Sequence, residues 1–336
     1  MTSEVSRRAA AFVEERLPQA RGLGLELADL IEDPESFTRA LTEGLERLVD
    51  PAYEAEQERV APGSGATIGV RWPLIRAVQR ALTPALAESS SSSVLWLAQR
   101  LSASELREVK LFSLPCLQRS LPDDPERSWQ LMRRLGRGAR DWITVDSLAD
   151  VYAAGILNEA FRWAEIEQLV YSEHRMERRL VGSTLARMPY RMAPAARRAA
   201  VQSGTSLDAR KALDLIAQLI GDADDQVEKA LSWAIREWSR VDPRAAEQLL
   251  VDETERAVRT DDGHRAWVVR DSLALIDPRV AAELRARLSG VRRRTGGPST
   301  SRASEAARSF AGPEALGALA ERVVAHQGER FARRSA

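Results

Sequence analysis

The sequence predicts an all-α protein, and three observations lead to that prediction. Alanine, leucine, arginine and glutamate dominate the chain, and no segment alternates polar and apolar residues as a half-buried strand would. Amphipathic segments of about 10–17 residues follow one another, joined by short connections that carry Pro, Gly or Asp. No heptad repeat is long enough for a coiled coil or a four-helix bundle. The pattern is typical of stacked antiparallel helix pairs, an α-solenoid of the HEAT type with one concave surface.

Taken in order, the first elements are amphipathic helices over residues 3–17 and 35–49. Residues 50–70 are expected to form a loop, and another helix starts near Pro73, a favoured first-turn residue. The serine tract at residues 89–93 is a linker or the loop that begins the next helix. Asp242-Pro243 and Asp277-Pro278 both combine a capping carboxylate with proline in the first turn. The remaining helices are expected at residues 104–119, 125–136, 142–156, 159–171, 175–188, 192–202, 206–220, 224–240, 243–256, 264–276 and 278–289.

Three regions are predicted along the chain: an N-terminal helical segment (1–55), a HEAT-like repeat domain (56–289) and a C-terminal extension (290–336). The extension is rich in arginine, and its first part, Gly290–Ser304, has the low-complexity composition of a mobile segment. A last weak helix is expected at 313–327.

The composition narrows the possible classes of protein. No apolar run reaches the roughly 18 residues of a membrane span, and the N-terminus lacks the apolar core of a signal peptide. A single cysteine, Cys116, fits the reducing cytosol, and its apolar neighbours indicate a buried structural thiol. The three histidines are scattered, so no zinc site and no metal cofactor are expected. The net charge is zero, but arginines cluster at 133–140, 175–198 and 285–294, which is compatible with one basic face.

The helix expected over Gln226–Arg240 has one residue out of place. Its apolar stripe consists of Val227, Leu231, Ala234, Ile235 and Trp238. Trp233 lies on the other side, among Lys229 and Arg236. An indole at such a position should pack against a neighbouring helix, a partner or a ligand.

A second helix, Trp142–Ile156, places an indole beside a carboxylate. Trp142 and Asp146 are four residues apart and lie one turn above another at the edge of the apolar stripe. No basic residue lies three or four positions from Asp146 within this helix. On this helix alone, an ordinary half-buried tryptophan and a solvated aspartate are the simpler interpretation.

Arg178 and Arg179 lie outside or at the edge of the apolar stripe of the helix at 175–188. Exposed arginines usually only solvate a helix, but guanidinium groups also bind phosphates through paired hydrogen bonds. Together, indoles, one carboxylate and arginines suit recognition of a cation beside a phosphate backbone, because indole faces attract cations and a carboxylate stabilises developing positive charge.

Five segments, in order, resemble the AlkD-type DNA alkylation repair glycosylases, a family of HEAT-like repeat proteins. They are GVRWPLIR at 69–76, ELREVKLFSL at 105–114, WITVDSLAD at 142–150, MERRLVGS at 176–183 and VEKALSWAIREWSRVDP at 227–243. The resemblance covers roughly residues 60–260. The last segment is the most specific, since it joins a lysine, a tryptophan and Arg-Glu-aromatic at fixed spacing.

The resemblance implies a glycosylase that excises cationic N3- or N7-alkylated purines, with small or bulky adducts, from duplex DNA in base excision repair. It implies that the concave face binds the DNA without flipping the base, that no cofactor is needed, and that the protein acts as a monomer on DNA in the bacterial cytoplasm. The catalytic residues it implies are Asp146, Trp142 and Trp233; the implied DNA-binding residues are Arg179, with Arg178 as the alternative, Lys229 and Arg236.

This chain departs from the family pattern at two places. Met176 occupies a position where the family usually has tryptophan, which leaves open whether Arg178 or Arg179 is the matching arginine. The stretch around Met192–Thr205 is longer than in the family.

Two other classes of function remain open. One is a non-catalytic HEAT protein that binds DNA structures, and the other is a scaffold for protein–protein contacts. A single concave, basic-rimmed cleft around Trp142, Asp146 and Trp233 would favour the glycosylase; the scaffold predicts that these residues are dispersed or buried.

Overall fold

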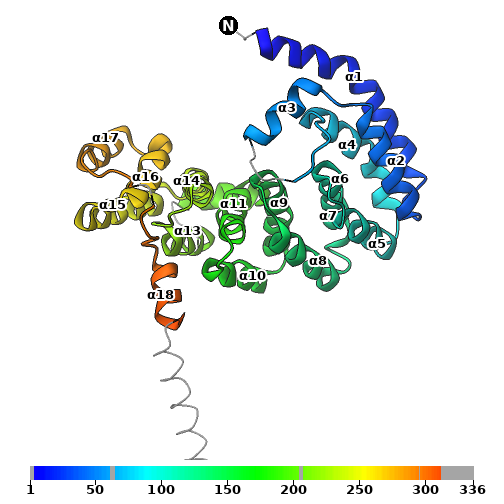
Figure 1. The fold of residues 1–336 in the computed structure, drawn as a ribbon. Coiled ribbons are helices and arrows are strands. Elements are labelled where there is room, and N and C mark those ends of the chain that lie inside the picture. Colours follow the sequence, from blue (N-terminus) through cyan, green and yellow to red (C-terminus); the bar gives the residue numbers. More distant parts are fainter. Residues whose placement is uncertain (1–3, 61–64, 204–206, 295, 312–336) are drawn as a thin grey trace, which may run out of the picture. The chain divides into compact units, whose positions relative to one another are not determined.

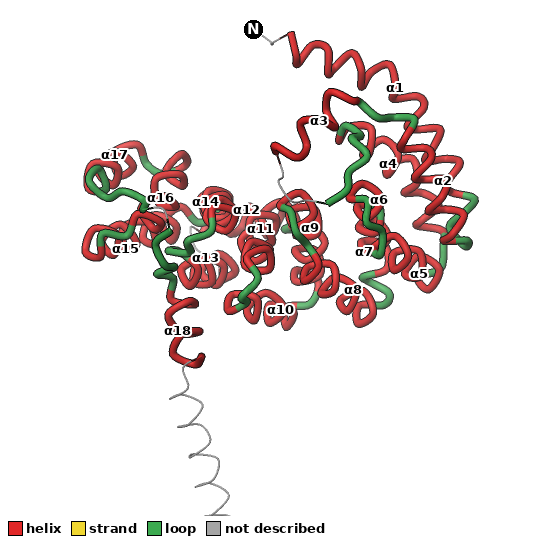
Figure 2. The backbone as a smooth tube through the Cα atoms, in the orientation of Figure 1, coloured by secondary structure: helices red, strands yellow, loops and turns green. Residues whose placement is uncertain are grey.

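The computed structural model describes residues 4–60, 65–203, 207–294 and 296–311. Over these residues the chain is helical and contains no strand, as predicted (Figure 2). A lone antiparallel bridge joins Val49 to Val70. No helix in the described part of the chain combines the length and the apolar composition that a bilayer span requires.

The contacts divide the chain into two units. Unit 1 comprises Met1–Glu165 and Arg179–Met192, and unit 2 comprises Ile166–Arg178 and Ala193–Ala336. The boundaries predicted at residues 55/56 and 289/290 do not coincide with this division, and they stay predictions.

Unit 1 is built from helices whose bounds largely follow the apolar periodicity. Within it, α4, α7 and α9 follow one another along one edge, and α2, α5 and α8 along the other (Figure 1). Its elements are α1 Glu4–Ala28, α2 Pro34–Glu46, α3 Pro51–Val60, α4 Trp72–Glu88, α5 Ser91–Ser102, α6 Arg107–Leu111, α7 Ser113–Ser120, α8 Pro125–Gly138, α9 Trp142–Asn158 and the 3-10 turn η1 Ala160–Arg162.

Unit 2 contains a second set of packed helices. In it α14 and α15 each contact α13, α16 and one another, and α18 packs on α13 (Figure 1). Its elements are η2 Gln168–Tyr171, α12 Pro194–Ser203, α13 Leu207–Leu219, α14 Asp225–Ser239, α15 Pro243–Thr260, α16 Gly263–Ser272, η3 Leu273–Leu275, α17 Pro278–Arg287 and α18 Arg302–Ala311. Two helices, α10 Trp163–Glu167 and α11 Arg175–Arg191, contain residues of both units.

The capping signals predicted from the sequence are confirmed. Asp242 caps α15 by accepting the backbone N–H of Ala245 at 3.0 Å, and Asp277 caps α17 by accepting that of Arg279 at 2.8 Å. Ser90, within the serine tract, caps α5. Each such bond satisfies a backbone donor that the first turn of a helix leaves without an intrahelical partner.

Several predicted boundaries are wrong. The first helix continues past residue 17, through the exposed Pro18, and ends at Ala28. The loop expected at 50–70 contains α3. The helix expected at 104–119 is interrupted between α6 and α7, and the one at 159–171 consists of three short pieces.

The segment expected to be mobile, Gly290–Ser304, makes defined contacts within unit 2. The Thr300 N–H donates to the Gly221 carbonyl at 2.8 Å, and the Arg293 guanidinium donates to Glu228 Oε2 at 2.6 Å. Gly221 has φ +99°, and a Cβ there would lie 2.6 Å from Thr300 Oγ1, so this close approach requires glycine. The helix expected at 313–327 lies outside the described residues.

Candidate functional site

Helix α9 presents one face to the core of unit 1 and another outward. Asp141 sets its start, because its carboxylate accepts the Thr144 N–H at 3.0 Å and the Thr144 hydroxyl at 2.8 Å. The inward face, which includes Leu148, is fully buried. Trp142 and Asp146 are half-buried on the outward face. Packing of the inward face therefore leaves Trp142 and Asp146 at the surface of unit 1.

The Asp146 carboxylate is held by two side chains of α11. Arg179 Nε donates to Oδ1 at 3.0 Å and its Nη2 to Oδ2 at 2.8 Å, a two-bond ion pair. The Ser183 hydroxyl donates to Oδ1 at 2.6 Å. The Asp146 side chain retains 17% exposure and that of Arg179 6%, so the pair lies at the edge of the solvent. The partner that α9 itself lacks comes from another helix, and the interpretation of Asp146 as a solvated carboxylate is wrong.

Arg179 also connects the carboxylate to the indole. Its guanidinium carbon lies 5.9 Å from the centroid of the Trp142 ring, within the range of a cation–π contact. The structure thus joins three residues singled out in the sequence and adds a fourth, Ser183, which that analysis missed. The only signal for Ser183 was its position one turn after Arg179. We call Trp142, Asp146, Arg179 and Ser183 the Asp146 cluster; all four belong to unit 1.

Arg178 has a different set of contacts, in unit 2. Its Nε donates to Asp222 Oδ2 at 2.6 Å, and its Nη1 donates to the carbonyls of Ser172 and Glu173 at 2.9 and 3.0 Å. Of the two adjacent arginines, the structure therefore brings Arg179, and not Arg178, to Asp146.

Helix α14 of unit 2 carries the third predicted group. Asp224 caps the helix, and the predicted apolar stripe is buried. Trp233 is half-buried on the opposite side, where Lys229 is exposed. Because Trp233 belongs to unit 2, its place beside Asp146 stays a prediction.

Arg236, on the same face of α14, is held by α16. Its Nη1 donates to Asp271 Oδ2 at 2.6 Å, and the Ser232 hydroxyl donates to the same oxygen at 2.7 Å. Burial raises the pKa of Asp271, but these hydrogen bonds outweigh it and leave that pKa below its usual value. Arg236 is thus fixed in place, with its charge partly neutralised.

A groove of about 420 Å³ adjoins the Asp146 cluster in unit 1. We call it the arginine groove. Ser147 follows Asp146 directly, and Arg187 lies one turn after Ser183, so the groove and the cluster share α9 and α11. Its lining residues are Trp72, Arg76, Gln79, Arg80 and Thr83 of α4, Leu114, Pro115 and Gln118 of α7, Ser147 and Asp150 of α9, and Arg187 of α11.

The charge of this groove is positive. Its one carboxylate, Asp150, already accepts from Arg191 Nε at 2.9 Å and Gln118 Nε2 at 3.1 Å. No carboxylate of the described residues pairs with Arg76 or Arg80; Arg76 instead lies 5.5 Å from the Trp72 ring centroid. The groove therefore suits an anionic, partly aromatic ligand.

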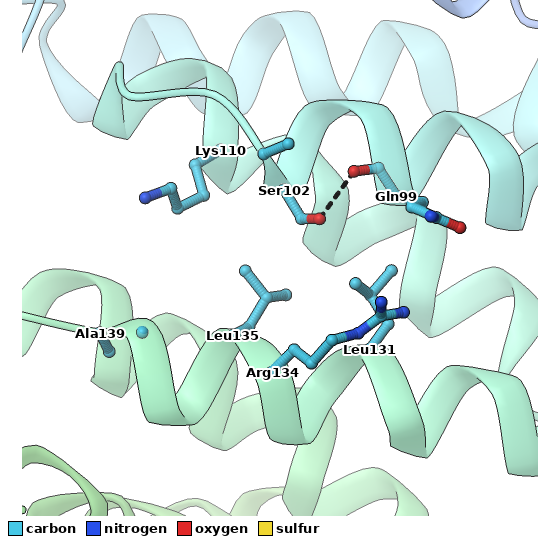
Figure 3. A pocket seen from close by; sticks show the side chains of 9 residues that line it. Gln99, Ser102, Lys110, Leu131, Arg134, Leu135 and Ala139 are labelled. Atoms are coloured by element: carbon cyan, nitrogen blue, oxygen red, sulfur yellow. Dashed lines mark hydrogen bonds between the residues drawn. The ribbon is translucent and has the colours of Figure 1, made fainter.

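A second hollow, of about 280 Å³, lies between α5, α6 and α8 of unit 1. Figure 3 shows Lys110 on one wall and Arg134 on the other, where Leu131 and Leu135 of the same helix also lie. It contains none of the residues predicted to act at the site.

Metal ligands and the single cysteine were the other reactive groups considered in the sequence. Among the described residues no group of three His, Cys, Asp or Glu side chains is placed to hold a metal ion. Cys116 is fully buried, as predicted, and burial raises the pKa of its thiol to about 12, so the nucleophilic thiolate is scarce at neutral pH.

Comparison with known proteins gives one match. A family model described as DNA alkylation repair enzyme matches residues 41–264. This range contains the Asp146 cluster, the arginine groove and α14. No curated protein and no solved structure matches the chain.

Proposed function

Because this chain belongs to the family of DNA alkylation repair enzymes, we propose that it is a DNA glycosylase that excises cationic N3- or N7-alkylated purines from duplex DNA. The observation that carries the proposal is the Asp146 cluster: an outward carboxylate, held by a guanidinium and a hydroxyl, beside an indole. In the proposed reaction, positive charge moves from the base to the sugar, and these groups can stabilise that charge.

The reaction breaks the C1′–N9 bond of the damaged nucleotide. Alkylation at N3 or N7 makes the purine cationic, so the bonding electron pair leaves with a base that departs neutral and needs no general acid. Positive charge then develops on the deoxyribose, and a carboxylate close to C1′ stabilises it. Water adds to C1′ and loses a proton to give the abasic site. Asp146 is the residue that we assign to this role.

Trp142 is assigned to pack against the sugar beside the carboxylate. Enzymes that flip a base hold it in a closed pocket and must supply the energy to unstack it. Asp146 instead lies on the outward face of α9 and is still 17% exposed. DNA lying across that face would bring C1′ to the carboxylate while the base stays in the stack, which favours excision without flipping.

The rest of the DNA interface is assigned from charge. The arginine groove, with Arg76 and Arg80, suits the phosphates that flank the lesion. Trp233 is assigned as the second indole on the sugar, with Lys229 and Arg236 as DNA contacts. Arg179 both orients Asp146 and offers positive charge to a nearby phosphate.

A second candidate function is non-catalytic binding of DNA. One observation favours this candidate: the Arg179–Asp146 ion pair joins two helices, and such a pair can serve a structural role without any catalytic one. A protein–protein scaffold is the third candidate. Enzymatic release of a base separates the first candidate from the other two.

The experiment measures release of free base from duplex DNA that carries 7-methylguanine. We expect release by the wild type and a loss of roughly 10²–10³-fold in rate for Asp146→Asn, the scale of removing one preorganised electrostatic group. Asp123→Asn is the matched control: Asp123 also pairs with an arginine and a serine, Arg119 at 2.5 Å and Ser91 at 2.7 Å, but outside the cluster.

The other outcomes separate the alternatives. Equal rates for the wild type and Asp146→Asn would remove Asp146 from the mechanism. The protein could release no 7-methylguanine but release a bulky N7 adduct from a second duplex. That result would support the glycosylase reaction with a bulky adduct as its substrate. Salt-dependent DNA binding without release of either base would support the second candidate, a non-catalytic DNA-binding protein. If the protein neither binds DNA nor releases a base, the protein–protein scaffold would remain.

A further inference from the structure

Ser183 contacts the proposed catalytic carboxylate from a fully buried position on α11. Its hydroxyl oxygen lies 2.6 Å from Asp146 Oδ1, closer than either nitrogen of Arg179. Hydrogen bonds from a hydroxyl to a carboxylate at this distance are of the strong, charge-assisted kind. A serine that only fills space in a core can donate its hydroxyl to a backbone carbonyl of its own helix, as the buried Ser239 does to Ile235.

The two oxygens of the carboxylate are held unequally. Among the described residues, Oδ1 accepts from both Arg179 and Ser183, whereas Oδ2 accepts from one donor, Arg179 Nη2. Each carboxylate oxygen has two lone-pair directions, so Oδ2 keeps the greater capacity for a further interaction. Oδ2 is therefore the oxygen suited to face the developing positive charge or the attacking water.

Bound DNA would offer Arg179 a second anionic partner. Phosphate oxygens bind guanidinium groups through the same paired bonds as a carboxylate, so DNA competes with Asp146 for Arg179. Ser183 has a short side chain with one rotatable bond to its oxygen, on a buried helical position, and its neutral hydroxyl attracts phosphate less. We therefore expect the bond from Ser183 to Oδ1 to persist when Arg179 contacts a phosphate.

We propose that Ser183 is a positioning residue that fixes the Asp146 carboxylate, with Oδ2 directed at the sugar, when Arg179 engages DNA. This inference rests on the proposed function. It assigns to Ser183 an effect on the rate of bond cleavage, through Asp146, and none on the affinity for DNA.

The kinetic test compares Ser183→Ala with a matched control on the next residue. We expect Ser183→Ala to lower kcat roughly 10- to 100-fold, the equivalent of one hydrogen bond to a charged group, with KM unchanged. Thr184→Val is the control, because Thr184 is also fully buried and its hydroxyl has no hydrogen-bond partner among the described residues. It should leave kcat unchanged.

A binding measurement keeps the test independent of turnover. The probes are two duplexes, one with a protonated pyrrolidine at the abasic position, which mimics the cationic sugar, and one with a neutral tetrahydrofuran. The wild type should bind the cationic duplex about 10-fold or more tightly than the neutral one. Thr184→Val should keep that preference. Ser183→Ala should lose most of the preference, while its Kd for the neutral duplex stays the same.

The outcomes distinguish this inference from the proposed function. If the wild type releases no base but Ser183→Ala abolishes a preference for the cationic duplex, the positioning role stands and the glycosylase assignment fails. If Ser183→Ala keeps the wild-type kcat and preference, or if the wild type shows no preference, the positioning role is refuted. If Ser183→Ala and Thr184→Val lower kcat equally, the effect would come from general destabilisation of α11, and the positioning role would be refuted as well.

Discussion

Arg179 and Asp146, which are 33 residues apart in the chain, form a two-bond ion pair between α11 and α9 with nitrogen–oxygen distances of 3.0 and 2.8 Å. The pair gives a charged partner to the Arg179 side chain, which is only 6% exposed, and orients the Asp146 carboxylate. It also joins α9 to the part of α11 that belongs to unit 1, so its geometry affects both stability and the proposed chemistry.

Replacing Arg179 with lysine should reduce the stability of the protein. Lysine keeps the charge but cannot form the paired bonds, and it leaves Asp146 with one weaker ionic contact. We expect a loss of about 1–3 kcal/mol in the free energy of unfolding, measured by urea denaturation. Arg191→Lys is the control, because Arg191 pairs with Asp150 near the surface and is 38% exposed; it should change stability by less than about 1 kcal/mol. Equal losses would show that the Asp146 pair is no stronger than a surface pair.

Replacing Arg76 or Arg80 with alanine should weaken DNA binding through charge alone. Each phosphate contact that is lost reduces the slope of log K against log salt by about 0.9 for duplex DNA. The measurement is the fluorescence anisotropy of an undamaged duplex between roughly 50 and 200 mM salt. Arg100→Ala provides the comparison, since Arg100 is paired with Glu35 at 2.7 Å outside the groove. If the slope of log K against log salt is unchanged for both Arg76→Ala and Arg80→Ala, the DNA phosphates do not contact the arginine groove.

The two tryptophans of α14 should respond in opposite ways to alanine substitution. Trp238 is fully buried, so Trp238→Ala should lower the free energy of unfolding by about 3–5 kcal/mol. Trp233 is half-buried, so Trp233→Ala should have a smaller effect on stability but a large effect on base release if it contacts the sugar. Urea denaturation and the 7-methylguanine assay measure the two effects. Wild-type release by Trp233→Ala would remove this indole from the site.

Cys116 should be unreactive in the folded protein at pH 8. Burial raises the pKa of its thiol to about 12, whereas an exposed cysteine ionises near about 8.5. Ellman's reagent should therefore label Cys116 slowly in buffer and rapidly in urea. The raised pKa also makes stability depend on pH. Above about pH 8.5 the unfolded chain loses the thiol proton while the folded chain keeps it, so the free energy of unfolding falls as the pH rises toward 12. Fast labelling of the native protein would contradict the burial of this residue.

The sequence predicted most helices because amphipathic periodicity is a local property. It identified α9 and α14, with their buried faces, and two Asp-Pro starts. It missed α3, although Asp50-Pro51 carries the same capping signal and Asp50 accepts the Ala52 N–H at 3.0 Å. The Pro-Gly-Ser-Gly break at 62–65 and the weak apolar pattern of Pro51–Val60 concealed that helix.

The candidate site was predicted only in part, for a related reason. Trp142 and Asp146 form a recognisable pair because they are one turn apart on a single helix. Ser183 belongs to the same cluster, but nothing in its spacing relates it to Asp146. Arg178 and Arg179 are neighbours with the same chemistry, and the sequence could not decide between them.

By itself, the sequence determined that the chain is helical, where its apolar faces lie and that an indole and a carboxylate are one turn apart at the edge of the apolar stripe of α9. These properties depend on residues a few positions apart, which the helical repeat of 3.6 residues relates directly. Only the tertiary structure decided that Arg179 and Ser183 hold Asp146 while Arg178 holds Asp222. Those choices depend on how separate helices pack, and packing joins side chains whose distance along the chain carries no information about their contact.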